Sequence, residues 1–381
     1  MDTQAMLLPP THDERARQEH SAAVRRFVTG TVMAGNREVY RRVLKPRFES
    51  RYGCAPDRHE VWELFRRESP YQWSSALRRT HQEHMWEAAA DMAERQGPEL
   101  AAMARREATK NRQFGSLRLD PRVAAPRYLT AVDIHCMPGN YHSASDSEDV
   151  FAGALYDRAI TSHGYKGANC DEVGQAVAGF VKRNFPDLRV RRVLDLGCTV
   201  GHSTLAYVDA FPKAEVHAID VAAPCLRYAH ARAELAGKAV HFSQQNAEQT
   251  DFAEESFDLV VSTIILHETS AKAIRAVFRE CRRLLRPGGV MAHCESRQYF
   301  AKEPFDAQWH AWGAHYNAEP FMQLMHETEL TALAVECGFA PAKSFPQMPM
   351  LGTLDRNFAL VDPGPTPRTY ADSLYVNGAV K

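Results

Sequence analysis

The sequence predicts an α/β protein with a Rossmann-like, mostly parallel sheet of seven strands and an additional all-α domain at its N-terminus. Three observations predict this fold class. Short runs of β-branched residues and leucine, such as Arg192–Leu196, lead into glycine-containing turns, as buried parallel strands do. These runs alternate with helix-like stretches over residues 170–362, which is typical of a doubly wound sheet. Residues 12–113 instead carry apolar side chains at helical spacing among many Arg, Glu and Ala residues.

The expected elements of the sheet domain follow one another in order. A helix over residues 169–185 leads into the first strand, Arg192–Leu196, and the second strand, Glu215–Asp220, ends in an acid. The later expected elements are a third strand with its turn (239–248), a fourth strand (256–263), a helix end and turn (279–289) that introduce the fifth strand, a last helix (330–337) and a final strand (358–361).

The turn after the first strand is the most informative feature of the chain. Its glycines, Gly197 and Gly201, lie four residues apart, and Asp195 precedes the first of them by two. Glycines there let the backbone approach a ligand closely. Asp220, at the tip of the next strand, lies beside this turn and can accept hydrogen bonds from both hydroxyls of a ribose. The sequence therefore predicts a site for an adenosine cofactor.

The spacing of the glycines disfavours a dinucleotide. A dinucleotide fingerprint needs glycines at offsets zero, two and five, and here those positions are Gly197, Thr199 and His202. Two of the three glycines are missing. With Asp195 before it and Gly201 at offset four, the turn instead resembles motif I of class I S-adenosylmethionine-dependent methyltransferases.

The resemblance extends over residues 150–340 because the later motifs follow in the family's order. It implies the class I methyltransferase fold and S-adenosylmethionine as cofactor. Two positions depart from the family pattern, since Thr199 replaces the middle glycine and Asn246 stands where many relatives have Asp. The residues that the resemblance assigns to the cofactor are Asp195, Gly197, Thr199 and Gly201 near its methionine portion, Asp220 at the ribose, Asn246 and Ala247 at adenine, and Tyr156 in a lid.

Composition bounds the class of protein. A chain of 381 residues is too long for the methyltransferase core alone, so about two domains are expected. No apolar run reaches the length of a membrane span, the first residues lack a secretion signal, and the eight cysteines form no Cys-x-x-Cys pair. We therefore expect a cytoplasmic protein with no membrane partner. A net charge of −1 disfavours nucleic acid as a partner.

The chain divides into four expected regions. Residues 1–130 form a helical domain that covers the substrate or forms a homodimer, and its arginine pairs, among them Arg78-Arg79, are interpreted as a solvated face. Residues 131–169 connect the domains and could form a cofactor lid with Tyr141, His142, Tyr156 and Asp157, although packing or surface roles explain each residue as well. Residues 170–362 form the cofactor-binding domain, and residues 363–381 a loosely attached tail.

An aromatic insertion is expected at about residues 297–325. Its aromatic and methionine side chains could wall an apolar substrate and surround a methylsulfonium, or they could only pack the insertion on the N-terminal helices. The residues concerned are Phe300, Phe305, Trp309, Trp312, Tyr316, Phe321, Met322 and Met325.

The catalytic candidates follow the fourth and fifth strands. His267 is the candidate base, because the stretch 264–270 resembles the Leu-His-Asp-Trp segment that carries the base in plant-type O-methyltransferases, although the tryptophan is absent. An imidazole with a pKa near 6.5 can accept a hydroxyl proton near neutral pH. Glu295 or Glu268 could orient it. A metal site built from His267, His293, Glu295, His310 and His315 is conceivable, but the spacing of these residues does not support it, and no metal site is predicted.

The resulting functional prediction is methyl transfer from S-adenosylmethionine to a small, partly aromatic or apolar metabolite. Oxygen is the first expected acceptor atom and carbon the second. Two alternatives stay open: a non-catalytic protein that binds the cofactor as a scaffold, and a nicotinamide-dependent oxidoreductase.

Overall fold

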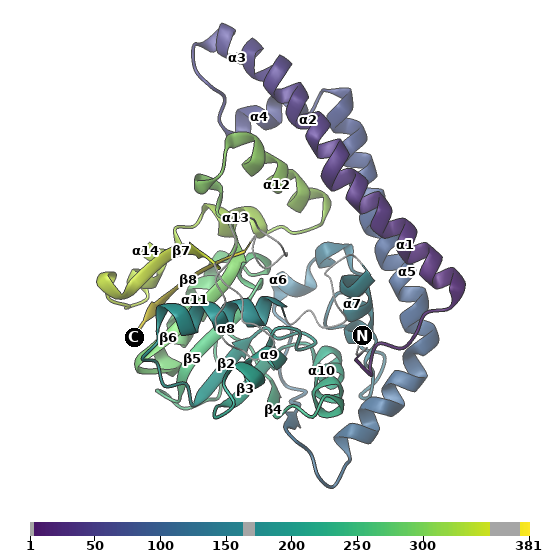
Figure 1. The fold of residues 1–381 in the computed structure, drawn as a ribbon, viewed down its shortest axis with the longest axis vertical. Helices are drawn as coiled ribbons and strands as arrows, with labels where there is room; N and C mark the ends of the chain where they lie inside the picture. Colours follow the sequence, from purple (N-terminus) through teal and green to yellow (C-terminus); the bar gives the residue numbers. More distant parts are fainter. Residues whose placement is uncertain (1–3, 163–171, 351–373) are drawn as a thin grey trace.

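The computed structural model describes residues 4–162, 172–350 and 374–381, which form one sheet domain and a long helical arm (Figure 1). The sheet has eight strands in the order β1-β4-β3-β2-β5-β6-β8-β7. All neighbouring pairs from β1 to β6 are parallel, and β8 runs antiparallel to both β6 and β7. The strands are β1 (Ser116–Arg118), β2 (Arg192–Leu196), β3 (Glu215–Asp220), β4 (Val240–Gln244), β5 (Phe257–Thr263), β6 (Leu285–Ser296), β7 (Ser344–Pro349) and β8 (Leu374–Val380).

Helices cover both faces of the sheet. The side chains of each strand alternate between these two faces. Val193 packs into the core beneath α8, α9 and α10, whereas the next residue, Leu194, packs into the core beneath α11 and α14. Because both faces are buried, the strands are apolar along almost their whole length. The covering helices are α8 (Glu172–Asn184), α9 (Thr204–Ala210), α10 (Ala223–Leu235), α11 (Ala271–Leu284) and α14 (Leu330–Glu336).

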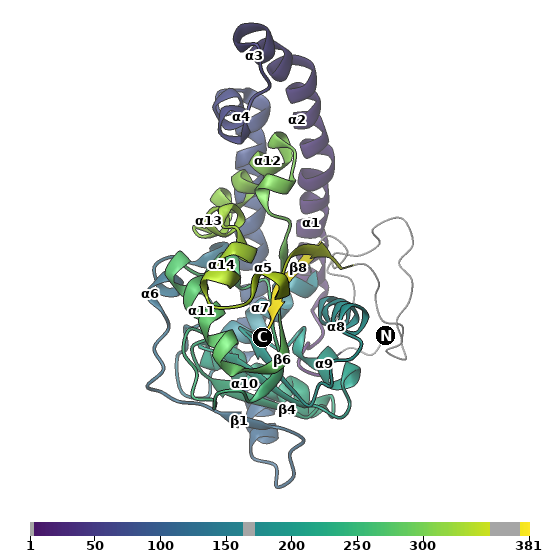
Figure 2. The same ribbon diagram turned by 90° about the vertical axis from the view of Figure 1, so that its left-hand side faces the viewer.

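The arm is built mainly from two helices that lie side by side in both views (Figures 1 and 2). Helix α5 (Ser69–Ala108) has 40 residues and is therefore about 60 Å long. Helix α1 (His12–Phe27) and a π-helical turn at Val28–Val32 pack along it. The remaining helices of the arm and its connection are α2 (Met33–Val39), α3 (Lys45–Tyr52), α4 (Arg58–Phe65), α6 (Arg127–Thr130) and α7 (Phe151–Ser162).

The insertion after β6 forms α12 (Pro304–Tyr316) and α13 (Met322–Glu327), and α12 packs between α4 and α5 (Figure 2). Its aromatic residues mostly join the apolar cluster of the arm. Phe305 stacks on Tyr40, and Trp312 lies against Tyr71 and donates a hydrogen bond to Ser75 Oγ. Packing on the N-terminal helices, one of the two alternatives for this insertion, thus describes these aromatic residues. None of the described helices combines the length and the apolarity that a bilayer crossing requires.

The prediction of a loosely attached C-terminal tail is wrong. Residues Leu374–Val380 form β8, a buried strand between β6 and β7, while the strand expected at 358–361 lies outside the described residues. The Asn377-Gly378 pair is typical of a turn, but here glycine serves a close approach, because a Cβ at Gly378 would lie 1.8 Å from the Met291 carbonyl oxygen. With β1 at the opposite edge, the sheet has eight strands rather than seven.

Candidate active site

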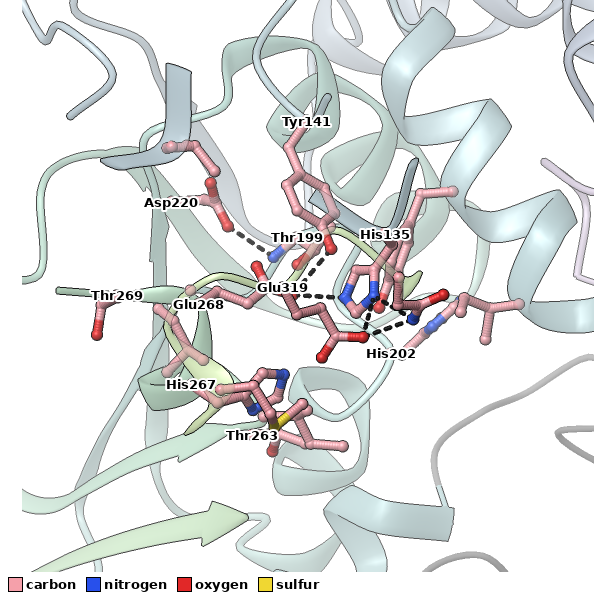
Figure 3. A pocket seen from close by; sticks show the side chains of 18 of the residues that line it. His135, Tyr141, Thr199, His202, Asp220, Thr263, His267, Glu268, Thr269 and Glu319 are labelled. Carbon is pink, nitrogen blue, oxygen red and sulfur yellow. Dashed lines mark hydrogen bonds and ion pairs between the residues drawn. The ribbon is translucent and has the colours of Figure 1, made fainter. Parts of the chain in front are cut away.

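A cavity of about 430 Å³ lies outside the carboxyl ends of β2 and β5 (Figure 3). The chain proceeds from β2 toward β4 on one side and from β5 toward β6 on the other. The strand order therefore reverses between β2 and β5, and ligands of open α/β sheets bind in the crevice at such a point. The turns after β2, β3, β4 and β5 line the cavity on the sheet side, and α5 and the Val28–Val32 turn line it on the arm side.

The turn after β2 has the backbone of a glycine loop. Gly197 has φ 68°, and a Cβ there would lie 2.1 Å from Ile265 Cδ1, so only glycine fits. Gly201 has φ 76°. Thr199 also has a positive φ, 48°, a backbone conformation in which a β-branched residue is strained. The Thr199 amide donates a hydrogen bond to Asp220 Oδ2 over 2.9 Å and holds the turn.

Asp220 lines the cavity at the tip of β3. Its carboxylate also accepts a hydrogen bond from the Ala222 amide at Oδ1 over 2.9 Å. Because each carboxylate oxygen has two lone pairs, one acceptor position remains on each oxygen for a ribose hydroxyl. Burial raises the pKa of Asp220 to about 6, against the lowering effect of the backbone hydrogen bonds.

Asp195 is more deeply buried than Asp220. It lines the cavity, and its Oδ2 accepts a hydrogen bond from Thr204 Oγ1 over 2.6 Å. Burial raises the pKa of Asp195 to about 7. Its carboxyl group ties the turn to the start of α9.

The turn after β4 places Asn246 and Ala247 at the cavity. Asn246 Oδ1 already accepts a hydrogen bond from the Glu248 amide over 2.9 Å, and its second lone pair remains for a donor such as an adenine amino group. Tyr156 lines the cavity between the rings of Tyr141 and His202, with centroid separations of 5.5 and 5.9 Å.

The other two residues expected in a lid, His142 and Asp157, do not line the cavity as Tyr141 and Tyr156 do. Asp157 is fully buried and bonded to His202 and Tyr228, so it is a packing residue rather than part of a lid. His142 is half-buried, and burial lowers its pKa.

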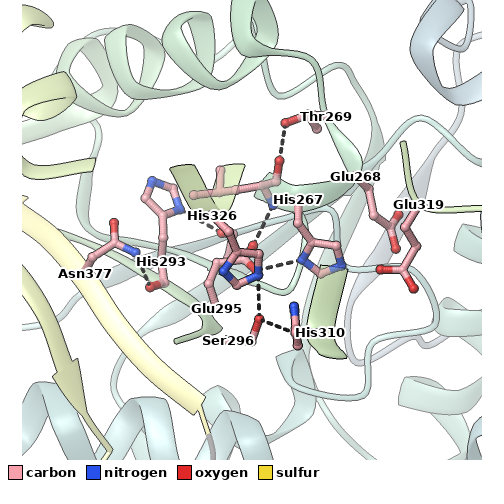
Figure 4. A network of polar contacts seen from close by, with 12 residues as sticks. His267, Glu268, Thr269, His293, Glu295, Ser296, His310, Glu319, His326 and Asn377 are labelled. Carbon is pink, nitrogen blue, oxygen red and sulfur yellow. Dashed lines mark hydrogen bonds and ion pairs between the residues drawn. The ribbon is translucent and has the colours of Figure 1, made fainter. Parts of the chain in front are cut away.

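His267 projects into the cavity from the turn after β5. The chain bends at Ile264, which has φ 57°. Glu295, buried at the end of β6, receives the bent segment: its Oε1 accepts a hydrogen bond from the Leu266 amide, and its Oε2 lies 2.7 Å from His267 Nδ1 (Figure 4). Burial lowers the pKa of His267, but the Glu295 carboxylate outweighs burial and raises it above 6.5 overall. His267 Nδ1 therefore carries the proton, and Nε2 is left to accept one.

Glu268 does not contact His267 in the same way. Its Oε1 lies 2.8 Å from His135 Nε2 and 3.0 Å from the Tyr141 hydroxyl (Figure 3). His135 Nδ1 lies 3.2 Å from Glu319 Oε1. Burial lowers the pKa of His135, but the two carboxylates outweigh it and hold the pKa well above 6.5. Of the two carboxylates expected to orient His267, Glu295 is in the position to do so.

Among the described residues, the group that could share a metal ion includes His267 but none of the other residues considered for a metal site in the sequence. Ligand atoms of His135, His267 and Glu268 lie within 4.8 Å of one another. An ion there would have to replace the His135–Glu268 hydrogen bond. His293 lies elsewhere, hydrogen-bonded to Ser262 and stacked on Phe278, and burial lowers its pKa to about 3.

Sequence reasoning missed the contribution of helix α5. Five of its side chains line the cavity: Arg78, His81, Gln82, Met85 and Trp86. Gln82 and Trp86 both donate to the His135 carbonyl oxygen, over 2.8 and 2.6 Å, and hold His135 at φ 59°. The spacing i, i+3, i+4, i+7, i+8 marks one helix face, and this mixed polar and apolar stripe was the signal available. The interpretation of Arg78 as part of a solvated face is wrong.

Comparison with known proteins places the sheet domain in a family. Residues 193–289 match the model of a methyltransferase domain. A malonyl-[acyl-carrier protein] O-methyltransferase from Methylococcus capsulatus is 32% identical over 39% of this chain and 52% of its own length. A probable phthiotriol/phenolphthiotriol dimycocerosates methyltransferase from Mycobacterium ulcerans is 30% identical over 29% of this chain and 42% of its own. The chain spans about half the length of these curated relatives.

Among solved structures, a protein of Nostoc punctiforme named as a putative O-methyltransferase aligns with a TM-score of 0.42 at 16% identity over 60% of each chain. The matched residues 193–289 contain the turn after β2, Asp220, the turn after β4 and His267. This chain therefore carries a methyltransferase domain of the class I family, whose cofactor is S-adenosylmethionine.

Proposed function

We propose that the protein transfers a methyl group from S-adenosylmethionine to a small, partly aromatic or apolar metabolite, at oxygen in the first instance and at carbon in the second. One observation carries this proposal. His267, which is held by the buried Glu295, lines the same cavity as the cofactor turn and Asp220. Methyl transfer needs alignment, exclusion of water and removal of one proton, and a fixed imidazole beside the cofactor supplies the last of these.

The walls of the cavity support a small acceptor. Met85 and Trp86 of α5 and Met322 of α13 supply apolar surface beside the polar groups of the sheet. In this proposal residues 1–130 cover the substrate, since α5 forms one wall. Oxygen as the acceptor atom agrees with the printed name of the Methylococcus relative.

Calorimetric titration with S-adenosylhomocysteine tests the cofactor, and release of that product from S-adenosylmethionine in a panel of phenols, alcohols and carbon acids tests the reaction. We expect binding, and release with one class of hydroxyl compound. Binding without release from any acceptor would favour the non-catalytic scaffold. An absence of binding would contradict the whole proposal.

The Asp220→Asn variant tests the ribose contact. Asparagine keeps the shape of the side chain but replaces one acceptor oxygen with an amide group that cannot accept a hydrogen bond. We expect the dissociation constant for S-adenosylhomocysteine to rise about tenfold or more, the effect of losing a hydrogen bond to a charged group. The control is Asp251→Asn, at an exposed acid paired with Arg118. Unchanged affinity in Asp220→Asn would remove the ribose role.

The Glu295→Gln variant tests how the pKa of His267 is set. A base acts when it is deprotonated, so the raised pKa of His267 places the acidic limb of the rate profile above pH 6.5. Without the Glu295 charge that pKa falls, and the limb should move to lower pH. The glutamine amide group can also donate to Nδ1, which favours the tautomer of His267 with its proton on Nε2. Turnover should therefore fall about 10²-fold. The measurement is product release against pH, with the exposed Glu254→Gln as control. An unmoved limb would show that another group titrates.

A further inference from the structure

Arg78 presents an unpaired positive charge to the cavity. It lies on the cavity-lining face of α5, and within residues 4–162, 172–350 and 374–381 no side chain or backbone group forms a hydrogen bond or an ion pair with its guanidinium. The Nε atom is buried without any partner. An unpaired cation removed from water costs folding free energy, so a structural role does not explain Arg78.

The guanidinium is nevertheless held in place. It lies over the Trp312 ring, with Cζ 5.2 Å from the ring centroid. Gly313 leaves room for it, because a Cβ there would lie 2.6 Å from Arg78 Nη2. This contact of the guanidinium with an aromatic ring uses none of its N–H donors. Arg25 of α1 lines the cavity as well and adds positive potential.

We propose that Arg78 binds a carboxylate group of the methyl acceptor, an inference that rests on the methyl transfer proposed above. The planar fork of arginine matches the two oxygens of a carboxylate. A phosphate dianion fits less well, because Glu319 and Glu268 also face this cavity and repel a second negative charge.

Arg78 and the candidate base line the same cavity. His267, His310, Glu319 and Arg78 are all among its lining residues. Met85, Trp86 and Met322 line it too. An acceptor can thus lay its carboxylate on Arg78 and its apolar body along these side chains, with its hydroxyl toward His267. The specificity for a carboxylate comes from the arm and the chemistry from the sheet.

Binding of matched acids and amides to the full-length chain saturated with S-adenosylhomocysteine tests the proposal. The probes are hydroxylated aromatic and aliphatic monocarboxylates, each beside its carboxamide and its phosphate-bearing analogue. We expect the acid of at least one pair to bind about tenfold tighter than its amide. Arg78→Gln should abolish that preference, whereas Arg79→Gln, at the exposed neighbour paired with Glu83, should keep it. A wild-type chain that binds no acid better than its amide, an unchanged preference in Arg78→Gln, or tightest binding of the phosphates would overturn the proposal.

The Arg78→Met variant separates a binding role from a structural one. Methionine fills a similar volume without a charge, so the variant should unfold at the same denaturant midpoint as the wild type or a higher one. A lower midpoint would show that the charge stabilises the fold and would overturn the proposal. These measurements do not depend on turnover. Selective carboxylate binding without methyl transfer to any acceptor would contradict the proposed reaction and leave Arg78 as a carboxylate site.

Discussion

Replacement of His267 with alanine is expected to lower turnover about 10²–10⁴-fold, the usual contribution of a positioned general base. The dissociation constant for S-adenosylhomocysteine should stay nearly unchanged, because the cofactor contacts proposed above come from the turns after β2, β3 and β4. The measurements are product release under saturating cofactor and calorimetric titration of the same preparation. A loss of turnover with intact binding separates proton removal from cofactor binding.

The alanine variant has one structural side effect, since it leaves the buried Glu295 carboxylate without its partner on His267 Nδ1. His267→Asn removes this effect, because the asparagine amide nitrogen takes the place of Nδ1 and donates to Glu295. It still cannot accept a substrate proton as imidazole does. Both variants should therefore be slow, and only the alanine variant should lose stability.

The matched control is His315→Ala, at an exposed histidine outside the cavity. Turnover of His267→Asn at the wild-type rate would show that His267 only packs against Glu295, and the proposal would then need another base.

The fold was predictable where local signals agree with the tertiary structure. Apolar runs ending in glycine or an acid located β2 and β3, since buried parallel strands carry a strong and continuous pattern. The weak strand β8 was not predictable. Its Asn-Gly pair is a turn signal in isolation, and the reason for Gly378, a close contact with Met291 of β6, arises only once the sheet is assembled.

The candidate site likewise contains residues that the sequence could predict and residues that it could not. Residues on the strand ends, such as Asp220 and His267, could be named because the ends of parallel strands converge at one edge. The arm residues could not be placed, because the stripe on α5 that contains Arg78 marks one helix face but does not state what this face meets. His135 also adopts a left-handed backbone that hydrogen bonds from Gln82 and Trp86 hold in place, and no local pattern predicts this conformation.

Replacement of Asp157 with alanine is expected to destabilise the fold by about 3–5 kcal/mol, the cost of breaking a buried charged pair from one side. Asp157 is fully buried on α7. Its Oδ1 lies 2.8 Å from His202 Nε2, and its Oδ2 accepts hydrogen bonds from the Tyr228 hydroxyl over 2.6 Å and from Gln4. The carboxylate therefore joins the N-terminal residues to α10 and to the turn after β2, and its removal takes a shared hydrogen-bond partner from His202, Tyr228 and Gln4.

The pH dependence of stability provides a second signature of the same residue. Burial raises the pKa of Asp157, but His202 and the other hydrogen-bond donors outweigh burial and lower it from 3.8 to about 2. A carboxyl group whose pKa is lower in the folded chain stabilises the fold above the unfolded pKa, so this contribution is present above pH 3.8 and is lost as the pH falls toward 2. Urea unfolding of wild type and Asp157→Ala across this range should show their stabilities converging in acid. The exposed Asp187→Ala is the control. A difference that stays constant down to pH 2 would show that packing, not the charge, is what Asp157 contributes.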